Sequence, residues 1–186
     1  MTDYYELFGI PRGLNLDLDD LQKRYYDQSR QLHPDRFMQK PEAERQRVLD
    51  MSSALNDANR TLKDPIKRAY YLVALEGFDI GEQRSKDVPP ELLEEVFELN
   101  MALEEMRSGD DSARPQLEQA EKNFTAMLSD TDAQLQSLFE RYDLGHSREI
   151  LSEIRHVLNR RKYIHNLVSE VERTLFPDPQ SPIPVP

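Results

Sequence analysis

The chain has no cysteine and no tryptophan among its 186 residues. Without cysteine it can have no thiolate nucleophile, no cysteine-based zinc site and no thiolate ligand for an iron–sulfur cluster. Disulfides are likewise excluded, so the fold must be stable through its own core. No apolar run is long enough to cross a bilayer, and the first residues, MTDYYELFGI, lack the basic and apolar segments of a secretory signal. We therefore expect a cytoplasmic protein.

Glycine is also scarce, whereas charge is abundant: 32% of the residues are charged and 38% are hydrophobic. This balance favours an all-α protein with a large solvated surface. The net charge of −11 argues against nucleic acid and anionic membranes as partners. Nearly all of the excess negative charge lies after Asp79, so a near-neutral N-terminal unit is joined to an acidic C-terminal unit. We expect these units to present surfaces to two different partners.

Four helices are predicted in the N-terminal unit, residues 1–78. Apolar residues at three- and four-residue spacing mark each helix, and Gly9 and the Asp64-Pro65 pair provide stop and start signals. The second and third helices are long and are joined by the loop HPDRFMQKP, which favours an antiparallel helical hairpin. The predicted helices are residues 4–8, about 17–32, about 41–62 and 65–75, and the buried stripe of the third comprises Val48, Met51, Leu55, Ala58 and Leu62.

Three long helical patterns follow a polar linker at residues 79–88. Their connecting loops are short, which implies antiparallel neighbours and a three-helix bundle over residues 89–175. The last segment, residues 176–186, is rich in proline and predicts a disordered or polyproline tail. The bundle helices are predicted at about 89–107, 113–142 and 147–175.

The loop between the two long N-terminal helices begins with His33-Pro34-Asp35. A single tripeptide is weak evidence, and the simplest interpretation is an ordinary turn in which Pro34 fixes the backbone. Its surroundings add information, because the preceding helix carries three basic residues and a long helix follows. Two of these basic residues are seven positions apart and therefore share one face of the helix. The basic residues are Lys23, Arg24 and Arg30, of which the first and last share that face.

Residues 1–76 resemble a J-domain. The similarity rests on the segments DYYELFGI, LQKRYYDQSRQLHPDRF and SSALNDANRTLKDPIKRAYYL. It implies that the basic face and the tripeptide dock on a DnaK-type chaperone and speed its ATP hydrolysis. The positive charges would steer association, and Asp35 would accept a charge-assisted hydrogen bond from the chaperone. The implied chaperone-binding residues are Lys23, Arg24, Tyr25, Arg30, His33, Pro34 and Asp35, with Tyr26 at a position where many J-domains have a basic residue.

The whole chain resembles the HscB (Jac-type) co-chaperones of iron–sulfur cluster biogenesis. It lacks the Gly/Phe-rich stretch and the Cys-rich module that often follow the J-domain of general chaperones, and PPELLEEVFELNMALEEM matches the layout of the HscB family. The resemblance implies an adaptor rather than an enzyme, with no catalytic residue, cofactor or metal. Its partners would be a DnaK/HscA-type chaperone and an IscU-like cluster scaffold protein, which the C-terminal bundle would bind.

The first bundle helix has more apolar residues than one buried stripe needs. For any single position, the core is the more common role of an apolar residue at helical spacing. Some must nevertheless be exposed, and we expect Leu93 and Phe97 to face a partner. By resemblance, the scaffold-binding surface comprises Leu92, Leu93, Val96, Phe97, Glu98, Met101, Glu105 and Tyr163, with Met101 where relatives can carry glutamate.

Two other interpretations remain open. Glu153 and His156 form one Glu-x-x-His motif of the kind found in di-iron carboxylate bundles. Glu98 and Glu121 are the candidates for further ligands. Such a centre needs two of these motifs, and the chain has one. Alternatively, the J-domain assignment holds and the bundle binds a client other than a cluster scaffold. An apolar surface by itself does not identify the protein that binds it.

Overall fold

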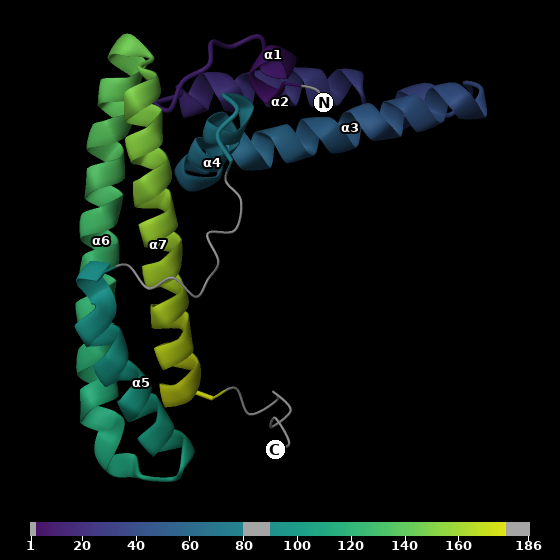
Figure 1. The fold of residues 1–186 in the computed structure, drawn as a ribbon. Helices are drawn as coiled ribbons and strands as arrows, with labels where there is room; N and C mark the ends of the chain where they lie inside the picture. The colour runs from purple at the N-terminus through teal and green to yellow at the C-terminus, as the bar shows by residue number, and fades with distance from the viewer. Residues whose placement is uncertain (1–2, 80–89, 178–186) are drawn as a thin grey trace. The chain divides into compact units, whose positions relative to one another are not determined.

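The computed structural model describes residues 3–79 and 90–177, and all regular structure in this part of the chain is helical (Figure 1). The all-α prediction is therefore confirmed. Two compact units are present: residues 1–80 with 138–154, and residues 81–137 with 155–186. Most of the predicted linker and of the proline-rich tail lies outside the described residues. None of the described helices combines the length and apolar character that crossing a membrane requires.

The first unit contains the predicted helical hairpin and its short companions. Asp17 accepts hydrogen bonds from the backbone N–H groups of Asp19 and Asp20, and Asp64 caps the helix that Pro65 begins in the same way. Gly9 ends the first helix with a φ of 62°, a left-handed conformation that glycine adopts without strain. The elements are α1 (Tyr4–Phe8), α2 (Leu18–Gln31), the 3₁₀ helix η1 (Pro34–Phe37), α3 (Glu42–Lys63) and α4 (Pro65–Leu75).

Four of the five residues predicted for the buried stripe of α3 are buried, but Met51 is 52% exposed. The prediction for Met51 is wrong although its helical position is right. α3 has 22 residues and α2 has 14, so α3 is about 12 Å longer than the helix it pairs with. This extra length does not explain Met51, because Val48 lies one turn closer to the start of α3 and is buried; the exposure is local to the Met51 side chain.

A buried arginine joins α3 to α4. Arg68 donates a hydrogen bond to the carbonyl oxygen of Leu62, which satisfies one group at the C-terminal end of α3. Burial lowers the pKa of the Arg68 guanidinium, while Tyr5 and Asp143 nearby favour its charged form. Burial also raises the pKa of the Tyr5 hydroxyl, which donates a hydrogen bond to the Gly13 carbonyl oxygen at 2.9 Å.

The first unit also takes in residues 138–154, which the sequence pattern predicts as part of the bundle. These residues are the end of α6 (Arg114–Gly145) and the start of α7 (Arg148–Leu175). The Asp143 carboxylate accepts hydrogen bonds from the backbone N–H groups of Leu14 at 2.8 Å and Asn15 at 2.6 Å. The Arg148 guanidinium lies 4.5 Å from the centre of the Phe78 ring. Contacts between residues more than 60 positions apart therefore complete this unit.

The second unit is built from α5 (Leu93–Arg107) and the remaining parts of α6 and α7. The 3₁₀ helices η2 (Pro90–Leu92) and η3 (Asp111–Ala113) flank α5. All three long helices contribute apolar side chains to one core. Figure 1 shows α6 and α7 side by side with α5 against them. The core includes Leu92, Val96, Leu99, Leu103, Leu117, Phe124, Ile164, Val171 and Leu175.

Candidate functional site

The loop after α2 holds the tripeptide in a single 3₁₀ turn. His33 has an extended backbone and serves as the N-cap of η1, whose first residue is Pro34. The Arg36 N–H donates to the His33 carbonyl oxygen at 3.0 Å, which closes the turn. A proline at the first helical position restricts this turn, and the loop therefore loses less conformational freedom when a partner binds.

His33 and Asp35 are exposed and oriented toward each other. The His33 Nδ1 accepts a hydrogen bond from the Asp35 N–H at 3.4 Å and lies 3.5 Å from the Asp35 Oδ2. A neutral imidazole that accepts at Nδ1 carries its proton on Nε2. The loop therefore presents an Nε2–H donor and a carboxylate acceptor side by side, a pair that suits charge-assisted recognition by another protein.

The exposed face of α2 lies next to this loop in the sequence. Lys23 and Arg30 are both exposed, as the helical spacing predicts. Tyr26 and Asp27 lie between them on the same face and are exposed as well. One carboxylate thus lies between two cations, so the face is less positive than the basic residues suggest. Its long-range attraction to an acidic partner remains, but is weaker and is screened by salt.

Arg24 and Tyr25 are also predicted chaperone-binding residues, but their polar groups have partners within the fold. The Arg24 Nε lies 2.7 Å from Asp20, and its guanidinium donates to the carbonyl oxygens at the end of α1. The Tyr25 hydroxyl donates to Asn56 on α3 at 2.9 Å. These contacts hold α1 and α3 against α2. The structure therefore gives both residues a positioning role, which spacing along α2 could not reveal.

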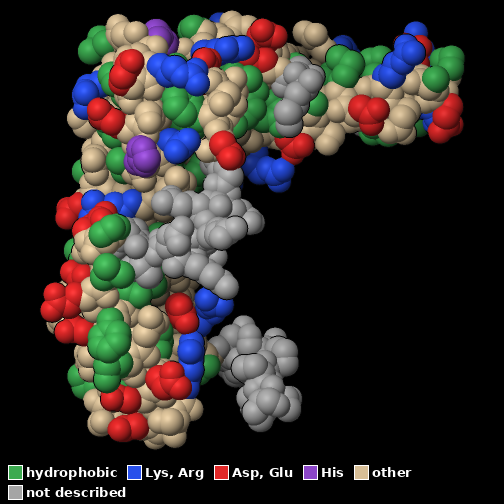
Figure 2. All heavy atoms as spheres, in the orientation of Figure 1, with side chains coloured by type: hydrophobic (Ala, Val, Ile, Leu, Met, Phe, Trp, Pro, Cys, Tyr) green, Lys and Arg blue, Asp and Glu red, His purple; other side chains and the backbone are tan. Residues whose placement is uncertain are grey.

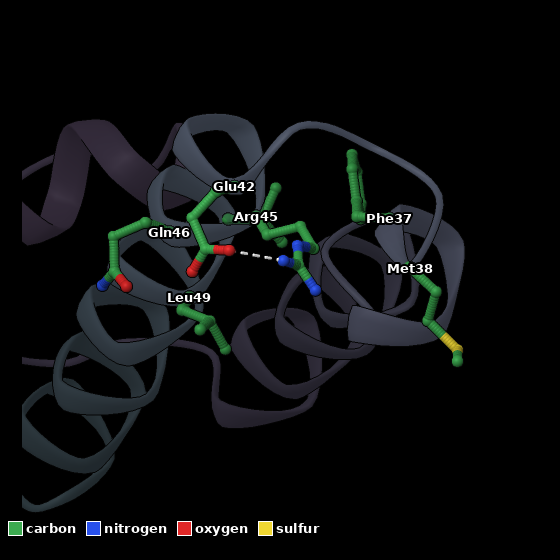
Figure 3. Close-up of a pocket in the computed structure, with 7 residues that line it drawn as sticks. Phe37, Met38, Glu42, Arg45, Gln46 and Leu49 are labelled. Carbon is green, nitrogen blue, oxygen red and sulfur yellow. Dashed lines mark hydrogen bonds and ion pairs between the residues drawn. The ribbon is translucent and has the colours of Figure 1, made fainter.

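A cavity of about 300 Å³ lies between η1 and the start of α3. Phe37 and Met38 border it from the loop, and Leu49 borders it from the helix (Figure 3). Helical spacing did not predict this cavity. The available signal was the apolar pair Phe37-Met38 within an otherwise polar loop.

The second unit carries an exposed apolar stripe on α5, formed by Leu93, Phe97 and Met101. These residues are four positions apart and are 55%, 65% and 52% exposed. Figure 2 shows hydrophobic side chains on the surface over α5 with acidic side chains beside them. Glu98 and Glu105, both predicted for the rim of the scaffold-binding surface, are exposed. An apolar centre with an acidic border is thus present on this helix.

Two residues predicted for that surface lie in the core instead. Leu92 is 1% exposed and Val96 is 5% exposed, and both pack among buried side chains of α6 and α7. The prediction that they contact a partner is wrong, because the inward-facing side of α5 includes Val96 and Leu99 and continues from Leu92 at the end of η2. Tyr163 is half-buried and packs against the same core, and burial raises the pKa of its hydroxyl.

The different burial of two adjacent leucines predicts a large stability effect for one and a small effect for the other. Leu92→Ala is expected to lower the free energy of unfolding by about 2–5 kcal/mol, because it leaves a cavity in the core. Leu93→Ala removes an exposed side chain and should change it by less than about 1 kcal/mol. Urea denaturation of the two variants and the parent protein measures the difference. Equal losses would contradict the assignment of Leu93 to the surface.

The di-iron interpretation has no support in the arrangement of its residues. Glu153 is exposed and forms an ion pair with Arg141 at 3.4 Å, and His156 is exposed as well. Glu98 is exposed on α5. Among residues 3–79 and 90–177, no three His, Asp or Glu side chains come together as a metal site. These side chains face solvent, as charged residues on bundle helices usually do.

Comparison with known proteins agrees with the helical hairpin and its His-Pro-Asp loop. Residues 3–71 match the DnaJ domain. The chain is therefore a J-domain protein. Residues 88–172 match the HSCB C-terminal oligomerisation domain. The chain belongs to the HscB family of co-chaperones, whose members are not enzymes.

Two solved structures extend this similarity over nearly the full length. The chaperone HscB from Vibrio cholerae is 30% identical with a TM-score of 0.63, and the match covers 92% of this chain and 96% of that one. The human co-chaperone protein HscB is 27% identical with a TM-score of 0.69, and the match covers 95% of this chain and 84% of that one. Both units therefore have counterparts in known HscB structures.

Proposed function

We propose that this co-chaperone stimulates the ATPase of a DnaK/HscA-type chaperone and delivers an IscU-like iron–sulfur cluster scaffold protein to it. The observation that carries the proposal is the presence of two chemically different exposed surfaces on one chain. The first unit presents His33 and Asp35, and the second presents the apolar stripe. One surface suits a polar trigger for a chaperone, and the other suits a client protein.

The trigger role rests on the J-domain and on the exposed pair at the start of η1. The side chains of His33 and Asp35 are exposed, so neither contributes to the hydrophobic core. Donor and acceptor groups on a restricted turn can bind a partner with a small ordering cost. The chaperone performs the hydrolysis itself, and this chain supplies contacts that favour its active state.

The client role rests on the apolar stripe. Three large apolar side chains in a row on a solvated helix are rare without a partner. The acidic border favours a client with basic residues around an apolar centre. The matched C-terminal family is called an oligomerisation domain. Self-association through the apolar stripe is therefore the alternative to client binding. We expect both functions to take place in the cytoplasm.

The direct test is a titration of this chain into a purified DnaK/HscA-type chaperone, with single-turnover ATP hydrolysis as the measurement. We expect the hydrolysis rate to rise by about tenfold or more at saturation, which corresponds to a barrier lower by about 1.4 kcal/mol. Addition of the scaffold protein should raise the rate further, since both partners are then held together. A chaperone rate that does not respond to the chain would contradict the proposal.

A further inference from the structure

The cavity beside η1, here called the loop pocket, combines an apolar interior with a charged rim. Val48 is buried, whereas Met38 is 70% exposed and Leu49 is 50% exposed. Glu42 and Arg45 form an ion pair at 2.6 Å on the helical side (Figure 3). Pockets that bind side chains are mostly apolar with a few polar groups at the edge, and the loop pocket has that composition.

The exposed walls of the loop pocket are not explained by folding. Met38 and Leu49 keep half or more of their surface in water, so they contribute little to the core of the first unit. α3 is eight residues longer than α2, and the pocket lies along the first turns of α3. Exposed apolar side chains around a cavity of about 300 Å³ are typical of a protein-binding surface.

The position of the pocket indicates which partner covers it. Phe37 and Met38 follow Asp35 by two and three residues, a reach of at most about 11 Å along an extended chain. A protein interface usually buries about 800 Å² on each side, a patch roughly 30 Å across and therefore much wider than this separation. A chaperone that contacts His33 and Asp35 therefore also covers Phe37 and Met38.

The charge around the pocket favours the same partner. Residues 21–50 contain seven Lys or Arg against five Asp or Glu, in a chain whose net charge is −11. This segment includes the basic face of α2, the loop and the start of α3. The Glu42–Arg45 pair adds no net charge to the rim of the loop pocket, so an acidic chaperone surface attracted to α2 is not repelled there, whereas a second copy of this acidic chain is repelled by its net charge.

We propose that the loop pocket binds an apolar side chain of the DnaK/HscA-type chaperone when the chaperone engages His33 and Asp35. This inference rests on the proposed function and adds a residue-level division of roles within it. The polar pair triggers hydrolysis, and the pocket holds the complex together. Buried apolar anchors contribute most to affinity, whereas charged groups set orientation and association rate.

The test is the double variant Met38→Ser with Leu49→Ser in the full chain, titrated into the chaperone. The concentration needed for half-maximal ATPase stimulation is expected to rise by about tenfold, while maximal stimulation is unchanged. Met51→Ser is the matched control, because Met51 is also a half-exposed apolar residue on α3 but does not line the pocket. Circular dichroism confirms that each variant is folded.

Three outcomes would overturn the inference. In the first, the double variant and Met51→Ser need the same concentration for half-maximal stimulation. In the second, the parent protein forms dimers in sedimentation experiments and the double variant does not, which assigns the pocket to a second copy. In the third, the parent protein itself gives no stimulation, and the proposed function then fails together with the pocket. Normal stimulation by the parent protein with an unchanged double variant rejects the pocket alone.

Discussion

His33→Gln is expected to abolish stimulation of the chaperone ATPase while leaving the fold intact. The imidazole accepts the Asp35 N–H at Nδ1 and presents a donor at Nε2 from one rigid ring. Glutamine has a similar size but a flexible side chain, so it cannot hold both groups in that geometry. An unpaired polar group at an interface costs about 1–3 kcal/mol, which corresponds to a roughly 5- to 150-fold weaker contact with the chaperone.

The matched control is His165→Gln, which replaces an exposed histidine on α7 by the same residue. Both histidines are exposed, so neither variant should change the free energy of unfolding by more than about 0.5 kcal/mol. Single-turnover hydrolysis and thermal unfolding are measured on the same samples. Full stimulation by folded His33→Gln would refute the trigger role of the loop, whereas a loss with His165→Gln alone would move the trigger to the second unit.

The helix boundaries were predictable because their signals are local. Asp17 and Asp64 cap α2 and α4 through N–H groups two and three residues ahead, and the residues themselves identify such caps. Gly9 ends α1 in the conformation that its missing side chain permits. The predicted bounds of the described helices consequently differ from the observed ones by only a few residues.

The roles of Arg24 and Tyr25 were not predictable in the same way. Each residue bonds to a segment that is distant in the sequence: Arg24 to the end of α1 and Tyr25 to Asn56. Asp143 is a stronger case, since it bonds to backbone groups 128 and 129 positions away. Spacing along one helix shows which residues share a face but not which other element covers that face. The exposure of Lys23 and Arg30 could be predicted because no other described element covers them.

The phase of α5 was ambiguous for a different reason. Val96, Leu99 and Leu103 form its buried face, and the apolar stripe occupies another face of the same helix. A helix with apolar residues both on its buried face and on a partner-binding face is only weakly amphipathic. The hydrophobic pattern therefore cannot separate packing from binding, and only the positions of α6 and α7 settle which face is inward. Local rules tend to fail at functional surfaces for this reason.

The second large effect is expected at the apolar stripe. Leu93→Ala combined with Phe97→Ala should weaken binding of the scaffold protein by about 100-fold, because two apolar anchors together supply roughly 3 kcal/mol. Calorimetric titration of the scaffold protein into the full-length variant measures the change. Basal stimulation of the chaperone without scaffold should stay at the parent value, since His33 and Asp35 belong to the first unit.

Phe176→Ala is the matched control, because Phe176 is 67% exposed and follows the end of α7, outside the stripe. Its loss removes as much exposed aromatic surface but should leave scaffold affinity unchanged. Sedimentation of the parent protein and the double variant separates client binding from self-association. Undiminished scaffold affinity together with loss of a dimer would assign the stripe to a second copy of the chain. Undiminished affinity with no change in mass would place the client on another face, because Met101 is then the one large exposed apolar side chain left on the described helix α5.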